Sequence, residues 1–142
     1  MTKEQIQEYT LKVTQGTKTD LVVITYDIIL TYINTGLEEY EKENMDDFVW
    51  NMKKSAEFLS ELIHSLDFQY EISYELMSLY LFIQKTLNNA VFKKTNENLA
   101  SAIKIIENLK VGFKKVAKSD GSGPVMENAG QVFAGLTYGK GT

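Results

Sequence analysis

One stretch of this chain, residues 21–33, carries more apolar surface than a helix needs for a single core contact. On a wheel of 3.6 residues per turn, its side chains separate into two stripes roughly 135° apart. The first stripe continues past the stretch and comprises Val22, Tyr26, Ile29, Ile33, Leu37 and Tyr40. The second comprises Leu21, Ile24, Ile28 and Tyr32. A bundle helix uses one stripe, so the second must be covered by another part of the chain or by a partner.

The same helical period governs most of the remaining chain. It predicts a short helix over residues 3–14 and long helices over about 19–43, 45–67, 71–94 and 96–118. The only proline is Pro124, so no proline interrupts these segments. Their connections are a few residues long, which makes successive helices antiparallel neighbours. We therefore predict an all-α protein in which residues 1–118 form an antiparallel up-down-up-down four-helix bundle with a short N-terminal helix.

The chain changes character after residue 118. Residues 119–124 combine serine, glycine and proline, which is typical of a break between structured segments. Beyond this break, apolar side chains are spread among further glycines, a pattern too rich in glycine to predict a helix. We expect residues 119–142 to form a flexible, Gly-rich tail.

Composition limits the functions open to the chain. There is no cysteine, which removes disulfides, thiolate catalysis and cysteine metal sites. The net charge of −4 argues against nucleic acid as a partner. No run approaches the ~18 consecutive apolar residues of a membrane span, and the first eight residues lack the apolar core of a signal peptide. We expect a soluble, cytoplasmic protein with no membrane insertion.

One motif has to be weighed as a metal site. Glu61 and His64 form a Glu-x-x-His pair on a predicted bundle helix, and di-iron bundles use two such pairs with two further glutamates. His64 is the only histidine, and the pair lies on the side of its helix opposite Leu59, Ile63 and Leu66. We interpret the pair as solvated, and predict no metal, no cofactor and no catalytic residue. The less favoured alternative is a metal-binding bundle.

Surplus apolar residues are therefore the main functional signal. Besides the second stripe, three residues of the 71–94 helix lie off its core stripe: Tyr74, Met77 and Leu81. A contiguous apolar patch of roughly several hundred Å² usually marks a partner site, and an amphipathic segment laid between two helices would fit it. We predict that this groove is lined by Leu21, Ile24, Ile28, Tyr32, Tyr74, Met77 and Leu81. The alternative is a structural bundle that buries its surplus stripe against another copy, forming a homodimer when free.

A series of landmarks across residues 9–113 resembles a known family. The landmarks are Tyr9, Leu21 with Thr25-Tyr26-Asp27, residues 54–56, Glu61-Leu62, Ser65-Leu66-Asp67, Leu76, Leu79-Tyr80 with Ile83, Leu87 with Ala90, and Leu109 with Phe113. In order, spacing and helical phase they are similar to the flagellin-specific export chaperones, the FliS family. The chain departs from the family pattern at Val91, where asparagine is common, and at Phe113, where tryptophan is common.

The resemblance implies a non-catalytic chaperone. Such proteins bind the disordered C-terminal segment of flagellin in the cytoplasm, prevent its premature polymerisation and deliver it to the flagellar type III export apparatus. Other flagellar co-chaperones are further expected partners. In the family, the N-terminal segment covers part of the client groove when the client is absent. The resemblance thus suggests Ile6, Tyr9 and Val13 as a removable lid.

Overall fold

The computed structural model describes residues 1–15 and 18–119, and the side chains of residues 1–11 and 18–115. Its described residues form helices and no strands, so the prediction of an all-α protein is confirmed. The helices are α1 (Lys3–Gln15), α2 (Lys18–Glu41), α3 (Met45–His64), α4 (Ile72–Lys93) and α5 (Leu99–Ser119). The predicted tail lies outside the described residues, apart from its first residue, which ends α5.

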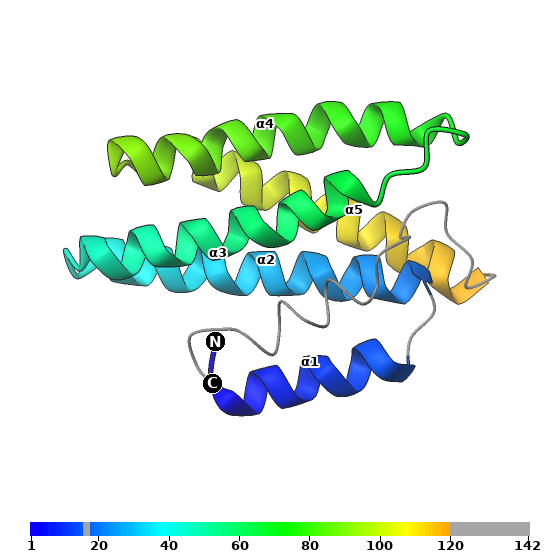
Figure 1. Ribbon diagram of the computed structural model, residues 1–142, viewed down its shortest axis with the longest axis horizontal. Helices are drawn as coiled ribbons and strands as arrows, with labels where there is room; N and C mark the ends of the chain where they lie inside the picture. The colour runs from blue at the N-terminus through cyan, green and yellow to red at the C-terminus, as the bar shows by residue number, and fades with distance from the viewer. Residues whose placement is uncertain (16–17, 120–142) are drawn as a thin grey trace.

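The four long helices form a closed ring (Figure 1). Along the ring, α2 packs between α3 and α5, and α4 packs between the same two helices on the opposite side. Successive long helices run in opposite directions, which confirms the up-down-up-down arrangement. The short α1 lies outside the ring against α2, and α2 is the only helix that α1 contacts among the described residues.

The core follows the first stripe of α2. Val22, Tyr26, Ile29 and Ile33 are at most 1% exposed, while the last two members of the stripe are half-buried. The other three long helices contribute Phe48, Met52, Leu59, Leu62, Leu76, Tyr80, Ile83, Leu87, Ala90, Leu99, Ala102, Ile106 and Phe113. Each fully buried large aliphatic side chain contributes about 1.5–3 kcal/mol to folding. The bundle is therefore stabilised mainly by these side chains.

Tyrosine hydroxyls meet at the centre of the ring. The hydroxyl oxygens of Tyr26 on α2 and Tyr80 on α4 lie 2.5 Å apart, which is a hydrogen bond across the diagonal of the bundle. The Phe113 ring of α5 packs edge-on against Tyr26, with ring centroids 5.8 Å apart. Burial raises the pKa of both tyrosines well above the usual value of 10, so both hydroxyls keep their protons at neutral pH.

The two ends of α3 show where local sequence signals fail. Asn44 precedes α3 at its N-cap position, but its side chain makes no cap bond and instead donates from Nδ2 to Glu39 Oε2 at 2.7 Å. The α3 helix ends at His64, three residues before the predicted end. Ser65 stops it: the Ser65 hydroxyl donates to the Leu62 carbonyl at 2.9 Å, and the chain then turns toward α4.

Candidate partner-binding surface

The second stripe of α2 is covered by the chain itself. Leu21, Ile24, Ile28 and Tyr32 are 5%, 7%, 0% and 1% exposed. The expectation that these four side chains are left over once the bundle has assembled is therefore wrong for the structure as it stands. Whether they contact a partner in another state of the chain stays a prediction.

On one side, α3 provides the cover. The Tyr32 ring lies with its centroid 5.9 Å from that of Trp50 and 5.9 Å from that of Phe58, stacking on the latter. Burial raises the pKa of Tyr32 to about 12, with a smaller contribution from the nearby Glu57 carboxylate. Trp50 and Phe58 are thus the α3 residues whose rings lie against Tyr32.

On the side of α2 that faces away from the ring, the neighbour is α1. Ile6 is buried, and the Tyr9 hydroxyl lies 3.3 Å from Thr31 Oγ1. The Thr31 hydroxyl already donates its proton to the Asp27 carbonyl at 2.8 Å, so Tyr9 is the donor in the contact between the helices. Ile24 lies seven residues before Thr31, on nearly the same face of α2, where α1 is placed to cover it. The third predicted lid residue, Val13, has a side chain outside the described residues.

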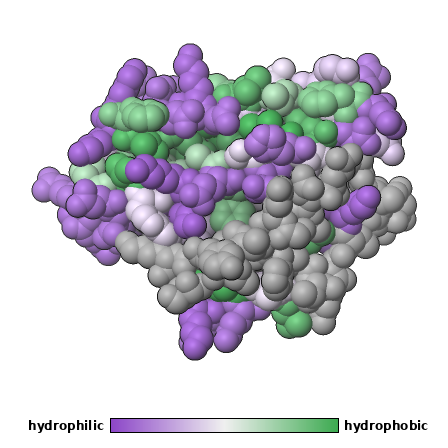
Figure 2. All heavy atoms as spheres, viewed as in Figure 1, coloured by the Kyte–Doolittle hydropathy of each residue, from purple (hydrophilic) through white to green (hydrophobic). Residues whose placement is uncertain are grey.

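The α4 part of the predicted surface is exposed. Tyr74 is 61% exposed and Leu81 47%, whereas Met77 is half-buried and packs against the core. Figure 2 shows hydrophobic side chains along the edge of the molecule that α4 forms. Because α2 and α4 lie at opposite corners of the ring, the structure does not bring the two predicted sets of residues together on one surface.

An apolar groove between α4 and α5 is absent from the sequence-based prediction. A cavity of about 260 Å³ opens there, lined by Ile72, Glu75, Leu76, Leu79, Asn108, Leu109, Gly112 and Phe113. A side chain added at Gly112 would meet no atom within 4 Å, so the groove is open at this point. A glycine within a predicted helix leaves a gap in the surface of that helix, so Gly112 is the sequence signal that could have indicated this groove.

The comparison with protein families identifies the kind of protein that carries these surfaces. The family model of the flagellar protein FliS matches residues 1–120. The chain belongs to the FliS family. No curated protein sequence matches the chain significantly.

Membership places the chain among flagellar export chaperones, a family of chaperones and not of enzymes. Flagellin and the export apparatus are partners of such chaperones in general. FliS chaperones are cytoplasmic, and one feature of the chain has to be weighed against that. By length and composition α2 is a candidate membrane span, but most of it is buried in the bundle, as in the core helix of a soluble protein.

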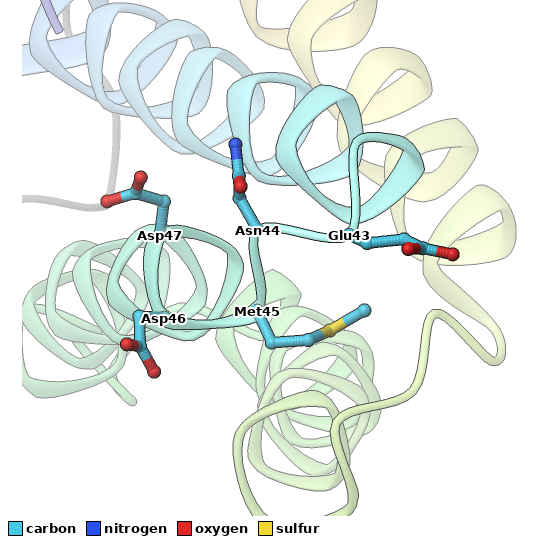
Figure 3. Close-up of a pocket in the computed structure, with 5 residues that line it drawn as sticks. All are labelled: Glu43, Asn44, Met45, Asp46 and Asp47. Atoms are coloured by element: carbon cyan, nitrogen blue, oxygen red, sulfur yellow. The ribbon is translucent and has the colours of Figure 1, made fainter.

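Two polar clusters of this FliS chain lie apart from the apolar surfaces. An open hollow of about 420 Å³ at the turn between α2 and α3 is lined by Glu43, Asn44, Met45, Asp46 and Asp47. Figure 3 shows that the acidic side chains point in different directions and do not converge on one position. Asp46 and Asp47 lie in the first turn of α3, where the helix dipole favours negative charge.

The Glu-x-x-His pair is the second polar cluster. His64 is exposed, and its Nδ1 lies 3.4 Å from the Ser60 hydroxyl. Glu61 is half-buried, and its Oε2 is enclosed without a hydrogen-bond partner. The interpretation as a fully solvated pair is therefore wrong for the glutamate. Among the residues that the structure describes, no three potential metal ligands are grouped together.

Proposed function

We propose that this FliS chain binds the disordered C-terminal segment of flagellin in the cytoplasm, prevents its premature polymerisation and delivers it for type III export. The observation that carries the proposal is the position of α1. This short helix lies outside the ring of four long helices and, among the described residues, contacts α2 alone. Its Tyr9 hydroxyl lies against Thr31, on nearly the same face of α2 as Ile24. A helix outside the ring can leave without separating the four long helices from one another.

The proposed binding mode follows from the entropy of the client. A disordered segment loses conformational freedom when it binds, so it must bury a large apolar area in return. The exposed α4 residues Tyr74 and Leu81, with Met77 at their edge, offer one part of that area. The groove beside Gly112 offers a second part.

The α2 stripe would supply the third part of the surface after α1 leaves. Ile24 shares the face that α1 covers, so we propose that it makes the main contact, with Leu21 and Ile28 beside it. Tyr32 is stacked on Phe58 and contributes at the edge toward α3. Ile6 and Tyr9, with Val13, would be the lid residues that the client displaces.

The test is a binding titration with a fluorescently labelled peptide that corresponds to the C-terminal segment of flagellin. Three proteins are compared: the intact chain, a chain that lacks residues 1–15, and an Ile6→Asp variant. Because displacement of α1 opposes binding, both altered proteins should bind roughly 3- to 30-fold more tightly than the intact chain. Gln7→Ala, an exposed position of the same helix, serves as the matched control and should leave the affinity unchanged.

Two outcomes separate the parts of the proposal. Unchanged affinity after removal of residues 1–15 would show that α1 is not a lid. An intact chain that neither binds the peptide nor delays flagellin polymerisation, followed by light scattering, would overturn the proposed client. Delivery is tested separately, by capture of the chaperone–peptide complex on the cytoplasmic domain of the export gate. Contacts with other flagellar co-chaperones remain a proposal of the same kind.

A further inference from the structure

The groove between α4 and α5 has the size and polarity of a peptide site. Its volume is about 260 Å³, and its lining is apolar apart from Glu75 and Asn108. Ile72, on the α4 side, is 42% exposed, so the groove presents apolar surface to water among the described residues. Small-molecule sites usually enclose about 300–1,000 Å³ and surround their ligand. An open groove of smaller volume suits a few side chains of a peptide better than a metabolite.

The groove lies close to the end of the described chain. The α5 helix ends at Ser119, and Phe113 and Asn108 in the groove lie about 9 and 17 Å before that end along the helix axis. The start of α4 and the end of α5 lie at the same end of the bundle (Figure 1). Residues 120–142 therefore continue from a point beside the groove. An apolar segment within them would be tethered next to an apolar site.

Such a segment is present at residues 132–138, which contain no charged residue. In an extended chain every second side chain lies on the same face. One face of this segment is apolar throughout and comprises Val132, Ala134, Leu136 and Tyr138. The first three of these span about 13 Å in extended form, and the groove spans about 10 Å between Ile72 and Leu79. Gly135 disfavours a helix, so the extended form is the better match.

From this match we propose that residues 132–138, the docking segment, bind in extended form in the α4–α5 groove of their own chain. Residues 120–131 are the linker. A Gly- and Ser-containing linker of twelve residues has an average span of about 17–21 Å, close to the distance that it must cross. It holds the segment at an effective concentration of about 1 mM. With an intrinsic Kd of about 0.2 mM, the segment occupies the groove about five-sixths of the time.

Two comparisons favour this occupant over others. A segment of another protein has to reach the groove from dilute solution, whereas the docking segment is beside it in every molecule. Within the tail, the other adjacent apolar residues are Val125 and Met126. In an extended chain Glu127 shares the face of Val125 and Asn128 shares the face of Met126, so neither face is apolar. The docking segment is thus the part of the tail that matches the groove.

The test uses the absence of cysteine from the chain, because a single introduced thiol then reports on one position. Gly112→Cys places the thiol in the groove, where an added Cβ would meet no atom within 4 Å. The rate at which this thiol reacts with Ellman's reagent is measured on the full chain without flagellin. Val132→Ser with Leu136→Ser should release the docking segment and raise the rate about sixfold, because the groove is then open all the time.

Matched variants define the segment and the site. Val125→Ser with Met126→Ser removes two apolar side chains from the linker and should leave the rate of the groove thiol unchanged. Ala100→Cys places a thiol at an exposed position of α5 about 18 Å from Gly112, and its rate should not respond to the changes at residues 132 and 136. Asn108→Cys repeats the measurement at a second position in the groove, so that obstruction by a side chain at residue 112 cannot hide docking. Circular dichroism checks that each variant remains helical.

The rates are compared over roughly 2–50 µM protein, because docking within one chain gives a protection that does not depend on concentration. The inference is overturned if neither groove thiol reacts faster after Val132→Ser with Leu136→Ser, or if the linker pair accelerates the reaction equally. Protection that disappears on dilution would overturn it as well, because the segment would then come from another copy. The thiol rates are measured without a peptide, so failure of the proposed client would leave this inference intact.

Discussion

The hydrogen bond between Tyr26 and Tyr80 links two helices at opposite corners of the ring, and removing it tests how much it stabilises the centre of the bundle. Each hydroxyl brings one proton, but the pair makes a single hydrogen bond at 2.5 Å. Neither hydroxyl has a further hydrogen bond among the described residues. The intact protein therefore already contains one buried hydroxyl proton without an acceptor, and the two partners depend on each other entirely.

The expected energies follow from this dependence. Tyr26→Phe or Tyr80→Phe alone leaves the other hydroxyl buried with no partner, which costs about 1–3 kcal/mol of unfolding free energy. The double variant removes both hydroxyls from a site that is at most 1% exposed, and should be within about 0.5 kcal/mol of the intact protein. The two substitutions should thus be strongly non-additive, with a coupling of about 2–6 kcal/mol, which is the sum of the two single losses.

Urea unfolding followed by circular dichroism measures all four corners of this cycle. Tyr70→Phe provides the control, because Tyr70 is 51% exposed and its hydroxyl reaches water. Its unfolding free energy should change by less than about 0.5 kcal/mol. Additive losses, with the double variant least stable of all, would refute the reasoning. They would mean that each hydroxyl is satisfied independently, for example by buried water.

Further predictions concern pH, the α2 stripe and the closest helix approach. Burial raises the pKa of Tyr26, Tyr80 and Tyr32, the last to about 12, so the unfolded chain loses tyrosine protons near pH 10 while the folded chain keeps them. In urea unfolding, tyrosine ionisation should leave the unfolding free energy unchanged below about pH 10 and should lower it from there toward pH 12. A urea midpoint that stays the same over this range would contradict the burial of these hydroxyls. Ile28→Asp places a charge at a 0% exposed site and should lower the unfolding free energy by about 3 kcal/mol or more in thermal or urea melts, whereas Asn34→Asp at an exposed position of α2 should not. Gly36→Val should cost about 1–3 kcal/mol by the same assay, because an added Cβ at Gly36 would lie 3.1 Å from Asn51 Cβ, which the α3 backbone holds in place, besides displacing the end of the Met52 side chain. Native stability would mean that α3 moves easily.

The helical period of the apolar residues was sufficient to predict most of the fold. The core positions of α2, from Val22 to Ile33, and of α5, from Leu99 to Phe113, were predictable because each is a regular stripe that ends where polar residues resume. Short connections then left little choice of topology. Helix ends were less predictable. Asn44 has a side chain suited to capping α3, yet that side chain is hydrogen-bonded to the Glu39 carboxylate instead.

The candidate site was predicted less well, because a helical wheel gives angles but not the number of neighbours. The prediction treated α2 as having one buried side, whereas α3, α5 and α1 surround it. This is why Ile28 and Tyr32 are buried although they lie far from the first stripe. By contrast, α4 contacts two helices among the described ones, α3 and α5, and its outward-facing Tyr74 and Leu81 are exposed. The groove at Gly112 depends on how far apart two helices lie, which no single helix encodes.

The single-neighbour attachment of α1 has a consequence for how the chain can vary. Within the part of the chain that the structure describes, detaching α1 breaks contacts with α2 and leaves every contact between the four long helices intact, so its opening is a local event with its own free energy. Substitutions at Ile6 or Tyr9 should therefore shift amide-proton exchange within α1 while exchange in the ring stays as slow as before. The free energy that opens α1, on which the proposed client binding depends, and the free energy that unfolds the ring can then be changed by separate substitutions in one polypeptide.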